Sequence, residues 1–108
     1  MKTGDIVLVP FPYSDLENVK VRPAVVVTIT KDKYNDIVVC AISSVIPNQI
    51  SDNEMTIKHN SLNKLRVDSI LKVDRIVTLK QKDKIANLGK LSSAELKTFK
   101  TKFSSLVQ

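Results

Sequence analysis

Two long apolar runs separated by a short polar segment are the sequence feature that most constrains how this chain folds. Residues 24–29 and 36–42 are continuous stretches rich in valine and isoleucine, and residues 31–35 between them are mostly polar. β-Branched side chains favour extended backbone, and a run without polar alternation is typical of a strand that is buried on both faces. The pattern therefore predicts a central β-hairpin, around which the rest of the chain forms a sheet.

Further strand segments flank this hairpin on both sides. Residues 5–9 form a β-branched run that we expect to end near Pro10, because proline cannot donate to a sheet ladder. Residues 13–21 are rich in turn-forming side chains and are predicted to form an exposed loop. The alternation over 55–58 predicts a short strand, and residues 69–73 and 75–79 predict further strand material, either two strands or one strand bent across Asp74. The sheet then has five or six strands.

The last quarter of the chain carries helix signals. Residues 83–88 are predicted to form a short helix that ends at Gly89. Ser92 and Glu95 have the spacing of a capping box, which predicts that a second helix begins there. One face of this helix is apolar and is expected to pack on the sheet: Leu96, Phe99, Phe103 and Leu106. The expected fold class is mainly β with a C-terminal α-helix, a small antiparallel barrel-like sheet, for which an SH3-like barrel is one solution.

The length of 108 residues is typical of one domain, so we expect residues 1–108 to form a single unit. No apolar run approaches the roughly 20 residues that a membrane-spanning helix needs, and the single cysteine, Cys40, cannot form an internal disulfide. Both observations favour a cytoplasmic location. Cys40 lies in an apolar run and is predicted to be a buried thiol. The single histidine, His59, follows a predicted strand and is expected to be exposed rather than catalytic. We predict no metal site.

The net charge of +6 is unevenly distributed. Residues 1–50 carry five basic and five acidic side chains, whereas residues 51–108 carry twelve basic and six acidic ones. The entire excess therefore lies in the second half of the chain. Such asymmetry favours a polyanionic partner, and a lysine-rich solvated surface is the alternative interpretation.

Four blocks of sequence, in the same order and at similar spacing, are similar to one known family. The first joins GDIVLVPFPYSDL at 4–16 to RPAVVV at 22–27, and the others are CAISS at 40–44, DSILKVDRIVTL at 68–79, and the segment 85–96 with its Gly-Lys-Leu turn. Together they resemble the PemK/MazF family of toxin endoribonucleases. The resemblance covers nearly the whole chain.

The resemblance implies an SH3-like barrel and a homodimer whose subunits share an RNA-binding groove. It also implies a metal-independent endoribonuclease toxin of a type II toxin-antitoxin system, without a cofactor, that a cognate antitoxin inhibits. Such an enzyme cleaves single-stranded RNA, chiefly mRNA. The 2′-hydroxyl attacks the adjacent phosphate and leaves a cyclic phosphate and a 5′-hydroxyl. This chemistry needs a base, an acid, and fixed donors that stabilise the charge on the phosphorane.

Arg22 and Ser43 are the predicted catalytic residues. The guanidinium of Arg22 binds phosphate oxygens bidentately, and the following Pro23 braces the backbone that presents it. The alternative is a surface arginine that pairs with Asp5 or Asp15. The resemblance places Ser43 at the position that a catalytic Thr or Ser usually holds. The alternative for Ser43 is a hydroxyl that caps the turn after its strand.

Ser44, Lys72 and Asp74 are predicted as possible acid-base groups or substrate contacts. Lys72 and Asp74 are two apart on a strand and are expected to face the same side, whereas Arg75 is expected to point to the opposite side. In some relatives the pair is Arg and Asp. Lys72 cannot reproduce the bidentate fork of an arginine, and an ordinary cross-strand ion pair is the alternative for Lys72 and Asp74.

Tyr13 and Lys20, in the predicted loop, are expected to contact RNA, with the tyrosine ring stacking on a base. A second function remains open beside cleavage. The same barrel can serve as a non-enzymatic toxin, as in the related gyrase-poisoning fold, or as an RNA-binding or protein-binding module. Arg22 with Ser43 favours cleavage, whereas Lys72 in place of arginine favours the alternative.

Overall fold

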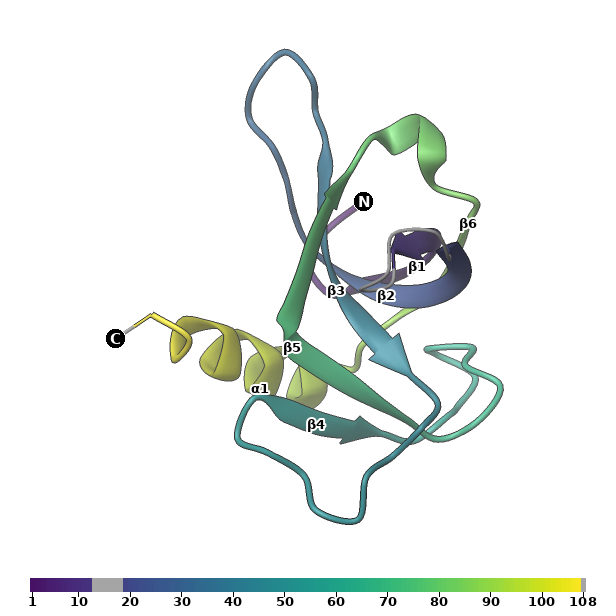
Figure 1. Cartoon of the computed structure of the whole chain (residues 1–108), viewed down its shortest axis with the longest axis vertical. Coiled ribbons are helices and arrows are strands. Elements are labelled where there is room, and N and C mark those ends of the chain that lie inside the picture. The colour runs from purple at the N-terminus through teal and green to yellow at the C-terminus, as the bar shows by residue number, and fades with distance from the viewer. Residues whose placement is uncertain (13–18, 108) are drawn as a thin grey trace.

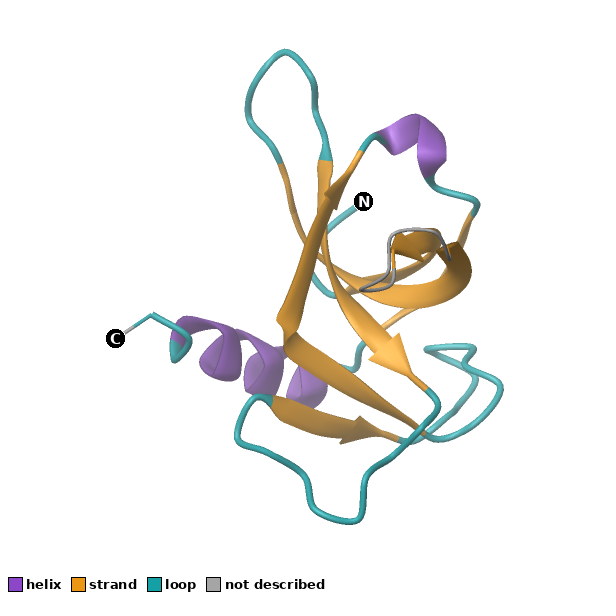
Figure 2. Cartoon of the chain, viewed as in Figure 1, coloured by secondary structure: helices purple, strands orange, loops and turns teal. Residues whose placement is uncertain are grey.

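The computed structural model describes residues 1–12 and 19–107, and in this part of the chain six antiparallel strands and one α-helix form the fold (Figure 1). The elements are β1 (Asp5–Pro12), β2 (Val19–Ile29), β3 (Ile37–Ser43), β4 (Glu54–Ile57), β5 (Ser69–Leu79), the short 3-10 helix η1 (Gln81–Asp83), β6 (Ala86–Lys90) and α1 (Ser93–Ser104). The strand order is β4-β5-β3-β2-β1-β6. The sheet curls into a half-barrel, with α1 beside its β4 and β5 end (Figure 2). The predicted fold class is confirmed.

The two apolar runs form the centre of the sheet, as predicted. β2 and β3 pair with each other and lie between β1 and β5. Their side chains alternate between two separate cores, because successive strand residues point to opposite faces. One core contains Val25, Cys40 and Ile42, and the other contains Ala24, Val26 and Val39. Burial on both faces explains why neither run alternates with polar residues.

The C-terminal helix begins and packs as the sequence predicts. The Ser92 Oγ accepts a hydrogen bond from the Glu95 N–H at 3.1 Å, and Glu95 Oε1 accepts one from the Ser92 N–H at 2.9 Å. Phe99 is completely buried in the core that contains Cys40, and the other apolar residues of this face pack around it: Leu96, Phe103 and Leu106. No helix in the described residues is long and apolar enough to cross a membrane.

The first hairpin is longer than predicted. β1 continues to Pro12, which lies opposite Val19, the first residue of β2. β6 pairs with β1 only as far as Leu8. Along residues 9–12 of β1, no strand among the described residues pairs with the edge that faces away from β2. The prolines can therefore lie in β1 without interrupting a ladder on that side. The predicted loop over 13–21 is thus too long at its C-terminal end, and its residues 13–18 lie outside the described part of the chain.

The prediction of a short helix over residues 83–88 is wrong. Residues 86–90 form β6, which pairs antiparallel with the outer edge of β1. The Ile85 N–H donates to the Leu8 carbonyl at 2.8 Å where this pairing starts. Gly89 does not end a helix. A Cβ at this position would lie 2.2 Å from the Leu62 carbonyl oxygen, so only glycine leaves room for the backbone of the turn after β4.

Candidate active site

A cleft of about 260 Å³ lies where β1 and β3 end and β2 begins, beside the middle of β5. Of the residues that the structure describes, eight line it: Phe11, Pro12, Arg22, Ala41, Ile42, Ser43, Lys72 and Arg75. Three of the predicted site residues therefore line one cleft. They come from different strands, and they are brought together because β3 pairs with β2 on one side and with β5 on the other. The fourth polar residue of the cleft, Arg75, is not among the predicted ones.

Arg22 lies inside β2, opposite Val9 of β1, and not at the end of a loop as the sequence predicts. Its neighbour Pro23 is also a strand residue, opposite Leu8. The guanidinium is thus carried by a paired segment of sheet, which is a more rigid support than a loop. The alternating pattern of Val19 to Arg22 is the sequence signal that indicates this strand.

Ser43 is the last residue of β3 and lies opposite Ile70 of β5. Its Oγ accepts a hydrogen bond from the Val45 N–H at 3.1 Å. This is the turn contact that the alternative interpretation predicts for Ser43. The two roles are compatible, because a hydroxyl that accepts one hydrogen bond still carries a hydrogen that it can donate.

Lys72 and Arg75 add two positive charges to the cleft, and Asp74 is not among its lining residues. The prediction that Arg75 points away from Lys72 is wrong, and β5 is irregular at this point. Glu54, opposite Lys72 on β4, has a lowered pKa, first because the Ser51 N–H donates to it and then because Lys72 and Arg75 are near. Among the described residues, neither Asp74 nor Glu54 forms an ion pair with Lys72.

Ser44 lines a different, larger cleft of about 550 Å³. Arg22 lies between the two clefts and lines both. Lys64 and Arg66, from the loop between β4 and β5, line the larger cleft together with mainly apolar side chains. Lys20 is exposed near the start of β2, opposite Phe11, and is a strand residue rather than a loop residue. The predicted contact of Tyr13 with RNA lies outside the described residues.

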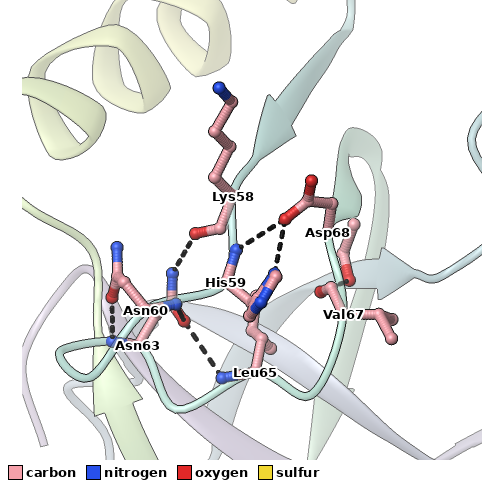
Figure 3. Close-up of polar contacts among 8 residues, drawn as sticks. Lys58, His59, Asn60, Asn63, Leu65, Val67 and Asp68 are labelled. Atoms are coloured by element: carbon pink, nitrogen blue, oxygen red, sulfur yellow. Dashed lines mark hydrogen bonds and ion pairs between the residues drawn. The ribbon is translucent and has the colours of Figure 1, made fainter.

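Hydrogen bonds from asparagine side chains connect the two halves of the loop between β4 and β5 (Figure 3). Asn63 is completely buried; its Oδ1 accepts hydrogen bonds from the Asn60 and Leu65 N–H groups, both at 3.0 Å, and its Nδ2 donates to the Lys58 carbonyl at 2.8 Å. Lys64 has a φ of 57°, a left-handed conformation that is uncommon for lysine and that these contacts support. The loop therefore holds Lys64 and Arg66 at the edge of the larger cleft.

His59 and Asp68 close the same loop from its two ends (Figure 3). The Asp68 Oδ1 lies 2.6 Å from His59 Nδ1 and accepts the His59 N–H at 3.0 Å. These hydrogen bonds, the side-chain one first, hold the pKa of Asp68 below its ordinary value. The His59 side chain is 57% exposed, as predicted, and neither of the two clefts includes it among its lining residues.

Cys40 is completely buried in β3, as predicted, and burial raises the pKa of its thiol to about 12. Such a thiol is a poor nucleophile at neutral pH. The described residues hold no group of three or more His, Cys, Asp or Glu side chains that could bind a metal ion. The polar side chains among the described residues that line the smaller cleft are those of Arg22, Ser43, Lys72 and Arg75.

Comparisons with known proteins relate this architecture to one family. Residues 2–107 match the family described as PemK-like, MazF-like toxin of type II toxin-antitoxin system. None of the curated proteins compared with the chain matches its sequence significantly.

Two solved structures share the fold. One is an endoribonuclease in complex with its cognate antitoxin from a mycobacterial species, with a TM-score of 0.71 and 16% identity over 97% of this chain and 92% of that one. The other is the Mycobacterium tuberculosis toxin MazF-mt6, with a TM-score of 0.63 and 14% identity over 92% of this chain and 93% of that one. With the family match over residues 2–107, the chain belongs to the PemK-like, MazF-like toxins of type II toxin-antitoxin systems.

Proposed function

We propose that this toxin is a metal-independent endoribonuclease that cleaves single-stranded RNA, chiefly mRNA. The observation that carries the proposal is that Arg22, Lys72 and Arg75 line the same cleft as Ser43, the last residue of β3. Among the residues that the structure describes, those that line this cleft include three cationic side chains and no Asp or Glu, which favours the binding of a phosphodiester. The positive charge of residues 51–108 attracts RNA from a distance, and the cleft binds one phosphate of it.

In the proposed reaction the 2′-hydroxyl of the RNA gives its proton to water as its oxygen attacks the adjacent phosphorus, and the bond to the 5′-oxygen breaks. The products are a cyclic phosphate and a 5′-hydroxyl. Arg22 binds two phosphate oxygens with its planar fork and stabilises the charge that grows on them. Ser43 donates its hydroxyl hydrogen to a phosphate oxygen. Lys72 is the candidate proton donor to the departing 5′-oxygen.

The proposed partners are RNA, a second copy of the chain and a cognate antitoxin. The mycobacterial endoribonuclease with a similar fold is in complex with its cognate antitoxin, and family membership extends this expectation to the present chain. Since the surface of residues 51–108 is basic, we expect the inhibiting segment of the antitoxin to be acidic. We further propose that residues 1–108 act as one domain in the cytoplasm.

Cleavage of RNA in excess EDTA tests the proposed function. The purified protein should cut single-stranded RNA without a divalent cation, and end-group analysis should find cyclic phosphates. Arg22→Ala should reduce kcat/KM at least about 100-fold, because it removes a donor to the developing charge. Lys97→Ala is the matched control, because Lys97 is exposed on α1 and lines neither of the two clefts. RNA that stays intact, or equal rates for Arg22→Ala and the parent, would overturn the proposal.

The same assay decides between cleavage and the non-enzymatic alternative. The feature that favours the alternative is Lys72, whose ammonium lacks the bidentate geometry of an arginine. A protein that binds RNA in the cleft without cutting it would be a binding module. In that case the Arg22→Ala variant would lose affinity for RNA, and no cyclic phosphate would form with either protein.

A further inference from the structure

The irregular point in β5 lies beside the smaller cleft. In the pairing of β3 with β5, Cys40 lies opposite Ile76, and the next residue of β3, Ala41, lies opposite Lys72. Two consecutive residues of one strand thus face two residues of the other that are four positions apart. The three additional residues, 73–75, form a bulge that is wider than a single inserted residue. Such bulges bend a strand and redirect its side chains, and they are frequent next to active sites.

The backbone of this bulge has defined hydrogen-bond partners. The Val73 N–H donates to the Asn53 carbonyl at 2.9 Å, and the Val73 carbonyl accepts the Cys40 thiol at 3.3 Å. Val73 itself is completely buried in the core. Because both polar groups of this residue are satisfied and its side chain is fixed, the bulge is a specific conformation of the strand.

The bulge explains why Arg75 lines the cleft. In a regular strand, residues 72 and 75 are an odd number of positions apart and face opposite sides. The additional residues break this alternation, and both Lys72 and Arg75 line the cleft that contains Arg22. Arg22 reaches the cleft from β2, and Arg75 reaches it from β5, on the other side of β3. The cleft therefore holds two guanidinium groups supplied from opposite flanks of one strand.

We propose that Arg75 is a substrate-binding residue of the active site, which holds the phosphate in this cleft together with Arg22. This inference rests on the proposed function and adds a residue to it. A guanidinium presents two parallel N–H donors to a phosphate, which the ammonium of Lys72 cannot do. Arg75 thus supplies, from a position three residues further along the same strand, the bidentate contact that Lys72 lacks.

Binding to RNA that cannot be cleaved tests Arg75 separately from catalysis. A single-stranded 2′-O-methyl RNA lacks the nucleophilic hydroxyl, so its dissociation constant reports binding alone. The logarithm of the affinity should fall with the logarithm of the salt concentration, and Arg75→Ala should reduce the magnitude of this slope by about 0.7, as loss of one phosphate contact on a single strand does. Arg75→Lys should keep most of the slope because it keeps the charge. Lys97→Ala is again the control and should match the parent.

Cleavage of unmodified RNA gives the second measurement. Arg75→Ala and Arg75→Lys should both reduce kcat/KM, by about 100-fold and about 10-fold, because lysine keeps the charge but loses the fork. Arg75 is exposed, so neither substitution should disturb the core, and the melting temperature of both variants should equal that of the parent. If Arg75→Ala has the same salt dependence of binding and the same kcat/KM as the parent, the proposal is overturned.

The two measurements separate the failure of this inference from the failure of the proposed function. If the parent protein does not cleave RNA but Arg75→Ala still reduces the salt slope, the enzymatic function is wrong and Arg75 remains a phosphate contact. If the parent cleaves RNA and Arg75→Ala cleaves and binds equally well, the function stands and the assignment of Arg75 is wrong.

Discussion

The Cys40 thiol lies 3.3 Å from the Val73 carbonyl oxygen, and this hydrogen bond joins the middle of β3 to the bulge in β5. The thiol is a weak donor, and it supplies a partner to the carbonyl of Val73, a residue that the bulge leaves out of the pairing between β3 and β5. Cys40 is completely buried, and desolvation raises the pKa of its thiol to about 12, with a smaller contribution from the nearby charge of Asp74. The single cysteine is therefore part of the support of the candidate active site and is not a nucleophile.

The native protein is expected to react very slowly with thiol reagents. At pH 8, a shift in the pKa from 9.0 to about 12 lowers the thiolate fraction about 1,000-fold, and burial restricts access further. Labelling with a disulfide reagent measures this directly. The matched control is the same protein in guanidinium chloride, where Cys40 should react at the rate of an unhindered thiol. Equal rates in the two states would contradict the buried, protonated thiol.

His59→Ala should raise the pKa of Asp68 toward its ordinary value of 3.8, because the hydrogen bond from His59 is the largest cause that lowers it. A carboxyl whose pKa is lowered by folding stabilises the protein fully at a pH above its unfolded-state pKa of 3.8. This stabilisation is lost as the pH falls through the folded-state pKa. An NMR pH titration of the Asp68 carboxyl carbon measures the shift.

The same variant should cleave RNA as fast as the parent, since neither of the two clefts described here includes His59 among its lining residues. A large loss of kcat in His59→Ala would instead assign the histidine a catalytic role.

Asn63→Ala should destabilise the protein by about 3 kcal/mol. The substitution removes a completely buried side chain that accepts from Asn60 and Leu65 and donates to Lys58, so three backbone groups lose their partner. Urea denaturation measures the change. Asn87→Ala, at an exposed position of β6, is the control and should change the free energy of unfolding by less than about 1 kcal/mol.

Gly89→Ala should also be destabilising, for a steric reason. The added Cβ would lie 2.2 Å from the Leu62 carbonyl oxygen and 2.9 Å from the Asn63 carbonyl carbon, both of which are backbone atoms. The turn has to shift to relieve this contact, at a cost of about 1–3 kcal/mol. Lys90→Ala, at the exposed neighbouring residue, is the comparison. A melting temperature of Gly89→Ala equal to that of Lys90→Ala would show that the turn moves freely.

Ser43 and Ser44 are neighbours in the sequence but line different clefts, so they should respond differently to substitution. Ser43→Ala should reduce kcat about 100-fold, because it removes a donor to the phosphate, and Ser43→Thr should restore most of the activity by returning the hydroxyl. Ser44→Ala should cleave at nearly the rate of the parent. Single-turnover cleavage rates measure all three. A larger loss in Ser44→Ala than in Ser43→Ala would move the reaction to the larger cleft.

Several parts of the fold were predictable because their signals are local. The apolar runs of β2 and β3 are determined by their own side chains, which need burial on both faces. The start of α1 is determined by two residues three positions apart, Ser92 and Glu95. The sequence also predicts Arg22, Ser43 and Lys72 as site residues, from the chemistry of their side chains and from the resemblance of the surrounding segments to a family.

Other parts depend on contacts between distant segments. β6 is a strand because the edge of β1 is available to it, and Gly89 serves the turn at Leu62 rather than a helix end. The position of Arg75 depends on the bulge, whose anchors are Cys40 and Asn53, both distant from it in the sequence. The sequence by itself determined the central strands, the helix and most of the reactive groups. Only the tertiary structure decided which of these groups share a cleft, because sheet register is set by backbone pairing across the whole chain rather than by any single segment.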